Sequence, residues 1–490
     1  MEPMKRSRTG YSSGLMQTKE AQLMLERASG ILLPVFSLPG PYGIGTLGQP
    51  ARQFVDFLAR AGQRWWQILP LGPVGAGNSP YMSPSAFAGN PLLLDLEALA
   101  QDGLLTQAEL ERARLPEQID RVDYARLRAC KLPLLRLAWS RWTQPDWPDR
   151  PDWVDPWCQW AAERALYGAS DPGFYEFLEY LFIRQWAQLK EYAHAHGVFI
   201  LGDIPIYVSP DSADVAQAPA LFQTDETGAF TCVAGVPPDY FSQDGQLWGN
   251  PLYDWSGHET ELFAWWRKRA AHCAALYDGL RIDHFRGLDR YWSVPAGAET
   301  AREGHWEPGP GLRLVEVLKQ AAGSMELVAE DLGILDDRAL AFFADSGLPG
   351  MSVLVYAFSP DGKSAYLPHN CPPNKVIYTA THDCPTFLQW LVEEASPEEK
   401  QFATDYLDLR LEDGLTWGAL RGAWGSPCAL AIAPLQDILG LGADARTNLP
   451  GTSGPENWSW RVRAEALNDG VAQRLRRLTQ VFGRLQTDLH

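Results

Sequence analysis

Acidic side chains follow several short apolar runs of this sequence, at the points where the runs end. They are Asp203 in GVFILGDIP (197–205), Asp283 in GLRIDHF (279–285), Glu330 and Asp331 in ELVAEDLG (326–333), and Asp383, preceded by His382, in KVIYTATHD (375–383). Burying an isolated charge is costly, so each of these charges needs a partner, water or a function. If the runs are strands whose carboxyl ends meet at one edge, the acids converge on one site.

A ring of carboxyl groups suits chemistry at a glycosidic bond. One ionised carboxylate attacks or stabilises the electron-poor anomeric carbon, while a second, protonated carboxyl donates to the leaving oxygen. Arg281 precedes Asp283 by two residues, so both side chains project from one face of a strand, and the guanidinium favours the ionised Asp283 that a nucleophile requires. Neighbouring like charges raise the pKa of the most buried carboxyl, and we assign that part to Glu330.

Each motif also has an interpretation without catalysis. The Arg–Asp pair could be a structural salt bridge, AEDLG could begin a helix, and THD could lie in a solvated loop. A metal-dependent hydrolase would also place His and Asp at barrel strand ends, but the nine His are dispersed and no H-x-H follows the first apolar run. The shared position at strand ends therefore favours catalysis, and we expect neither a metal nor an organic cofactor.

Eight apolar runs alternate with segments of helical pattern, and they predict the elements that position the acids. The runs cover 31–36, 65–71, 197–205, 279–285, 326–333, 351–358, 375–383 and 428–435. Most do not alternate between apolar and polar residues, which is typical of parallel strands covered on both faces. We therefore predict a closed (β/α)₈ barrel, with an open doubly wound sheet as the alternative.

Two connections are too long for simple loops between strand and helix. Residues 72–196 begin with a stretch rich in Gly, Pro and Ser and continue as mainly helical sequence, while 206–278 are dense in Pro, Gly and aromatic residues. We expect both to be inserted subdomains over the carboxyl-terminal face of the barrel. Residues 1–25 form a polar tail, so the catalytic domain spans 26–490.

The composition limits the possible partners. The net charge of −18 argues against binding to nucleic acid or to anionic membranes, which need a positive protein surface. The seven Cys are scattered without a C-x-x-C pair, the first residues hold no apolar run of signal-peptide length, and no later segment is long and apolar enough to span a bilayer. We therefore expect a cytoplasmic protein. The 20 Trp and 17 Tyr offer flat faces on which sugar rings can pack.

GDIPIYV, GLRIDHFRG, AEDLG and THD together resemble the four signature regions of the α-amylase superfamily. NSPYMSPSAFAGNPLLLDL (78–96), VAGVPPDYFSQDGQLWGNPLYDW (233–255) and RTNLPGTSGPENWSWR (446–461) narrow the resemblance to the 4-α-glucanotransferases of glycoside hydrolase family 77, also called amylomaltases or disproportionating enzymes. The similarity covers residues 30–485. It implies a retaining mechanism through a covalent glucosyl-enzyme intermediate, with maltooligosaccharides, maltodextrin, or starch- and glycogen-derived glucans as substrates.

The resemblance also implies roles for individual residues. Asp283 would be the nucleophile, Glu330 the general acid/base, and Asp383 the residue that stabilises the transition state. The implied substrate-binding residues are Ser79, Tyr81, Asp203, Arg281, His382 and Asn448, together with Tyr240, Phe241, Trp248 and Asn250 in or beside a lid over the acceptor side.

Two alternatives to transfer stay open, and the chain departs from the family pattern in two places. A hydrolase of the same superfamily would use water as the acceptor, and a silent glucan-binding barrel would catalyse nothing. The departures are CPT directly after Asp383 and Ser359 at the end of the sixth run. We expect both to alter the affinity for glucan or the preferred glucan length.

Overall fold

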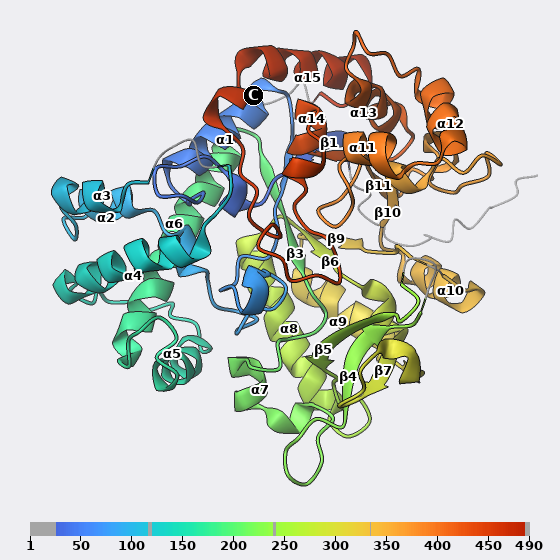
Figure 1. Cartoon of the computed structure of the whole chain (residues 1–490). Helices are drawn as coiled ribbons and strands as arrows, with labels where there is room; N and C mark the ends of the chain where they lie inside the picture. The colour runs from blue at the N-terminus through green and yellow to red at the C-terminus, as the bar shows by residue number, and fades with distance from the viewer. Residues whose placement is uncertain (1–25, 116–119, 239–241, 334, 486–490) are drawn as a thin grey trace, which may run out of the picture.

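A computed structural model of the chain describes residues 26–115, 120–238, 242–333 and 335–485. Its centre is a parallel sheet surrounded by helices (Figure 1). The sheet has eight strands in the order β10-β11-β12-β1-β2-β3-β6-β9. The strands are β1 (Ala28–Leu32), β2 (Trp65–Gln67), β3 (Phe199–Ile204), β6 (Gly279–Ile282), β9 (Glu326–Ala329), β10 (Gly350–Val353), β11 (Lys375–Tyr378) and β12 (Leu430–Pro434). Each lies within or overlaps one of the eight predicted runs, and the prediction of a (β/α)₈ barrel is confirmed.

Helices surround this sheet and contact one another in the order α13, α15, α1, α6, α8, α9, α10. Their bounds are α1 (Gln49–Arg60), α6 (Pro172–Ala195), α8 (Glu259–Leu276), α9 (Leu312–Ala322), α10 (Asp337–Ser346), α13 (Leu415–Gly425) and α15 (Asp469–Val481). Apolar side chains such as Ile31, Val328 and Ile432 are fully buried in the core. The apolar runs are continuous because both faces of the strands are covered.

The barrel is closed between β9 and β10 by a side chain as well as by the backbone. The Ala329 N–H donates to the Pro349 carbonyl at 2.9 Å, and the Met351 N–H donates to Asp331 Oδ1 at 2.6 Å. Lys375 Nζ binds the other oxygen of Asp331 at 2.8 Å. A carboxylate thus takes the place of a second backbone acceptor where the two strands meet.

The first long connection forms a mainly helical lobe on one side of the barrel (Figure 1). It contains α2 (Leu96–Gln101), α3 (Gln107–Ala113), α4 (Tyr124–Arg141) and α5 (Val154–Glu163). The α6 helix, which follows, packs against α1 and β3.

The second connection carries the short helix α7 (Ala213–Gln217) and contributes to a separate antiparallel sheet. This sheet has the order β5-β4-β7-β8, with β4 (Cys232–Val236), β5 (Gln246–Pro251), β7 (Arg290–Pro295) and β8 (His305–Pro308). Two of its strands come from the connection after β6, for which we had predicted no strands.

Three further helices follow the last barrel strands: α11 (Phe387–Gln389), α12 (Pro397–Leu407) and α14 (Leu435–Leu439). In the described part of the chain, no helix is long and apolar enough to cross a membrane.

The predicted strands extend too far at their carboxyl ends. The fourth run was predicted to reach residue 285, but β6 ends at Ile282. His284 has a left-handed backbone with φ of 49°, and a 3₁₀ turn (Phe285–Leu288) follows it. Asp283 and Glu330 therefore lie directly after their strands, and His382 and Asp383 lie in the connection beyond β11, where backbone groups are free to bind side chains.

Candidate active site

A buried guanidinium joins two of the predicted acids at the carboxyl ends of β3 and β6. Arg281 Nη1 donates to both oxygens of Asp203, at 2.9 and 2.8 Å, and its Nη2 lies 2.8 Å from Asp283 Oδ1. The Asp203 side chain is fully buried, whereas 27% of the Asp283 side chain is exposed. The predicted pairing of Arg281 with Asp283 is confirmed, and Asp283 is the member of this cluster that solvent or a ligand can reach.

Glu330 lies beside this cluster and binds two backbone amides. The His284 N–H donates to Oε2 at 2.8 Å and the Leu332 N–H donates to Oε1 at 2.7 Å. Burial raises the pKa of Glu330 to about 7, with Arg281 opposing the increase and Asp283 adding to it. The predicted direction is confirmed, although burial contributes more than the neighbouring like charges. The raised pKa lets Glu330 keep a proton closer to neutral pH than an ordinary glutamic acid does, as a general acid requires.

Asp383 lies across the site and is held by three side chains. Asn448 Nδ2 donates to its Oδ1 at 2.6 Å, His382 Nε2 lies 3.1 Å from its Oδ2, and Arg446 Nη2 donates to its backbone carbonyl at 3.0 Å. Burial would raise the pKa of Asp383, but His382 and Asn448 outweigh it and lower the pKa to about 2. Asp383 is therefore a carboxylate at all ordinary pH values, in contrast to Glu330.

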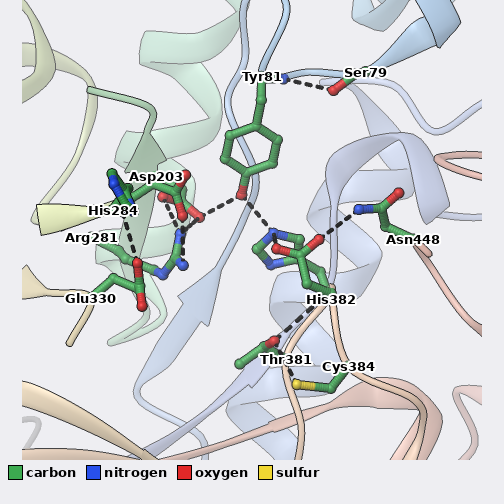
Figure 2. Close-up of polar contacts among 12 residues, drawn as sticks. Ser79, Tyr81, Asp203, Arg281, His284, Glu330, Thr381, His382, Cys384 and Asn448 are labelled. Atoms are coloured by element: carbon green, nitrogen blue, oxygen red, sulfur yellow. Dashed lines mark hydrogen bonds and ion pairs between the residues drawn. The ribbon is translucent and has the colours of Figure 1, made fainter. Parts of the chain in front are cut away.

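Tyr81, from the first inserted lobe, connects the two halves of the site (Figure 2). Its hydroxyl donates to Asp203 Oδ2 at 2.8 Å and lies 2.8 Å from His382 Nε2, while its ring stacks on the His382 ring at 12°. Ser79 Oγ accepts the Tyr81 N–H at 3.2 Å, so Ser79 shapes the turn that presents Tyr81. The first insert thus reaches the mouth of the barrel.

The second insert reaches the site through Trp248 on β5, which packs against His284. The Trp248 and His284 rings are perpendicular, with centroids 4.7 Å apart. Asn250 is buried, and its Nδ2 donates to the Val208 carbonyl at 2.8 Å, which ties β5 to the segment after β3. The predicted lid residues Tyr240 and Phe241 lie outside the described residues.

Asp331 does not join the ring of acids, so its predicted place at the mouth is wrong. Its side chain is buried between β9 and β10 and binds Lys375 and the Met351 amide. Of the two acids after β9, Glu330 faces the site and Asp331 faces β10.

The unusual residue after Asp383 is accommodated inside the protein. The Cys384 thiol is buried and lies 3.1 Å from Thr381 Oγ1 and 3.2 Å from the Tyr356 hydroxyl. Cys384 therefore packs behind the segment that carries Asp383.

The sequence interpretation missed two residues that shape the site. Arg446 binds the Asp383 carbonyl and also donates to the Asn448 carbonyl at 2.8 Å, and it begins the motif that had drawn attention to Asn448. His284 follows Asp283 and donates its backbone N–H to Glu330, and burial lowers the pKa of its ring to about 4.

Across the described residues, no group of three or more His, Cys, Asp or Glu is arranged to hold a metal ion.

Comparison with known proteins agrees with this geometry. The family model described as 4-alpha-glucanotransferase matches residues 33–171 and 141–467. A 4-alpha-glucanotransferase from Clostridium butyricum is 40% identical over 92% of this chain and 100% of its own length. This chain belongs to the 4-alpha-glucanotransferase family. It is an enzyme of the transferase class.

Two further relatives extend the match. The 4-alpha-glucanotransferase of Synechocystis is 42% identical over 94% of this chain and 98% of its own length. The amylomaltase from Streptococcus agalactiae in complex with acarbose superimposes with a TM-score of 0.88 at 36% identity, covering 94% of this chain and 100% of that one. The shared fold extends over both inserts as well as the barrel.

Proposed function

We propose that this glucanotransferase moves a segment of a 1,4-α-D-glucan to the 4-hydroxyl of an acceptor glucan or glucose by a retaining double displacement. The observation that carries the proposal is the pair of unlike carboxyls at the mouth of the barrel. Asp283 is bound to a buried guanidinium, and Glu330 has a pKa of about 7. One carboxylate and one proton-carrying carboxyl are what the two steps of a retaining reaction require.

In the first step, Asp283 Oδ2 attacks the anomeric carbon while Arg281 holds Oδ1. The bond between that carbon and the glycosidic oxygen breaks, and Glu330 gives its proton to the departing oxygen. In the second step, Glu330 takes the proton of the acceptor hydroxyl, whose oxygen attacks the same carbon and releases Asp283. The proton returns to Glu330 and the configuration at carbon is retained.

The remaining residues hold the sugar during these steps. We assign to Asp383 the hydroxyls next to the reacting centre, because His382 and Asn448 fix its carboxylate in the charged form. His382, Asn448 and Tyr81 would surround the same sugar, whereas the fully buried Asp203 would act through the Tyr81 hydroxyl that it binds.

On the acceptor side, Trp248 offers a ring face beside His284, and Asn250 stabilises its strand. Ser79 supports Tyr81. We retain Tyr240 and Phe241 as lid residues by family resemblance. A lid that excludes water and an aromatic surface that binds sugar would favour a glucan over water as the acceptor.

The substrates we propose are maltooligosaccharides, maltodextrin and the glucans of starch or glycogen, in a cytoplasmic setting without nucleic-acid or membrane partners. The acarbose complex of the Streptococcus agalactiae amylomaltase supports oligosaccharide binding by this fold. All seven Cys are free thiols, as a reducing compartment would allow.

Incubation with maltotriose tests the proposal. Disproportionation yields glucose and longer chains while the total of reducing ends stays constant. An increase in reducing ends would instead identify a hydrolase, and unchanged chain lengths would identify a glucan-binding protein without activity. Chromatography of the products together with a reducing-sugar assay separates the three outcomes.

A further inference from the structure

Two consecutive residues at the start of α14, Gln436 and Asp437, bind the two segments that meet at Asp383. We propose that this pair is a positioning clamp for Asp383, although neither residue touches the proposed substrate site. The inference rests on the proposed function, since it assigns Asp383 a place in the reaction. Both side chains are buried, at 2% and 0% exposure.

Asp437 holds both ends of the segment that carries His382 and Asp383. Its Oδ2 accepts the Thr379 hydroxyl at 2.5 Å, and its Oδ1 accepts the Phe387 N–H at 2.7 Å. Thr379 directly follows β11, and Phe387 begins α11. Both oxygens of one carboxylate therefore bind the segment before and after Asp383.

Gln436 holds the second segment. Its Nε2 donates to the Ala445 carbonyl at 3.1 Å and to Thr447 Oγ1 at 2.9 Å. These two residues flank Arg446, and Asn448 comes next in the chain. Arg446 and Asn448 are the residues that bind the Asp383 carbonyl and carboxylate. The two segments are thus joined twice, once at α14 and once at Asp383.

The position of α14 explains why a clamp can be rigid there. The helix begins directly after β12, and Gln436 and Asp437 are its second and third residues. A buried carboxylate costs stability unless its bonds are satisfied, and here both oxygens bind the segment whose geometry matters. Displacement of a transition-state group by about 1 Å can cost on the order of 10²-fold in rate, so the clamp has a catalytic consequence.

The test is Asp437→Asn, which keeps the shape but replaces one acceptor oxygen by a donor. With α-maltosyl fluoride as donor and maltose as acceptor, we expect kcat to fall about tenfold or more while KM changes little. The same change in an Asp383→Asn background should lower kcat by less than about twofold, because the clamp acts through Asp383. The fluoride leaving group keeps the double variant measurable.

Matched variants separate an effect on the position of Asp383 from a general loss of stability. Thr379→Val removes the hydroxyl that Asp437 accepts and should reproduce the loss in kcat, whereas Thr379→Ser retains the hydroxyl and the activity. Asp278→Asn is the control, since Asp278 accepts the Ile200 N–H at 2.8 Å just before β6, at the opposite end of the barrel. It should lose stability without losing kcat.

The outcomes are distinguishable from failure of the proposed function. Incubation of the wild-type protein with maltotriose decides whether transfer occurs. If the protein hydrolyses maltotriose instead, the same single and double variants are compared by their rates of reducing-end release. An unchanged kcat in Asp437→Asn, or losses that multiply in the double variant, would overturn the clamp. A protein without any activity would overturn the proposed function and the clamp together.

Discussion

The raised pKa of Glu330 has a measurable thermodynamic consequence in the variant Glu330→Gln. The pKa of this carboxyl is about 7 in the folded protein, against an ordinary value of 4.5. The folded state therefore binds this proton more tightly than the unfolded state, and stability falls as pH rises from the lower value to the higher one. Complete ionisation costs the folded protein about 3 kcal/mol, an order-of-magnitude figure.

Glutamine removes this cost but loses part of the hydrogen bonding. Glu330 accepts two backbone N–H groups, and the amide can accept only at its oxygen, a loss of about 1 kcal/mol. We expect the variant to match wild type near pH 5 and to be more stable by about 2 kcal/mol at pH 8. The same variant should lose about 10²- to 10⁴-fold in kcat with maltotriose, because the general acid is gone.

Chemical unfolding followed by Trp fluorescence at pH 5, 6, 7 and 8 measures the stability difference, with the exposed Glu303→Gln as the control that should follow wild type. A difference between Glu330→Gln and wild type that stays constant across this pH range would refute the raised pKa. Wild-type transfer activity should decline above about pH 7 for the same reason.

Three further variants test the other parts of the site. Asp283→Asn should lower both transfer and hydrolysis by about 10³-fold or more, and substantial residual transfer would show that another residue is the nucleophile. Tyr81→Phe keeps the ring but removes the hydroxyl between Asp203 and His382, so kcat/KM for maltotriose should fall about tenfold, and an unchanged value would contradict the role. Asn448→Ala removes the donor to Asp383 Oδ1 and should lower kcat about tenfold in initial-rate assays at near-wild-type thermal stability; unaltered turnover would count against Asp383 as the transition-state group.

Several features of this protein could be predicted from the sequence because they depend on local pattern. Eight continuous apolar runs separated by helical segments predicted the barrel, since a strand buried on both faces must be apolar throughout. The pairing of Arg281 with Asp283 followed from a spacing of two residues. The direction of the Glu330 pKa shift, upward, was also predicted. The size of that shift depends on how much solvent the fold excludes from the carboxyl.

Strand lengths and side-chain directions required the tertiary structure. The run at 279–285 was predicted too long because the apolar Phe285 follows the point where His284 turns the chain with a positive φ. Asp331 follows Glu330 in a motif of acids, but its side chain binds the Met351 amide and Lys375 where β9 meets β10, away from the mouth. Neither the turn nor this contact has a signature in the residues themselves.

The partners of Asp383 show most clearly what the sequence alone determined. The THD motif predicted an acid after the seventh strand, and family resemblance pointed to Asn448. Only the tertiary structure decided which residues hold these two segments. Asp437 binds the segment that carries Asp383, and Gln436 binds the segment that carries Asn448, because β11, β12 and the loops after them lie together. Hydrogen bonds between residues 58 and 65 positions apart depend on the pairing of β11 with β12, and a local pattern of residue types does not encode such a contact.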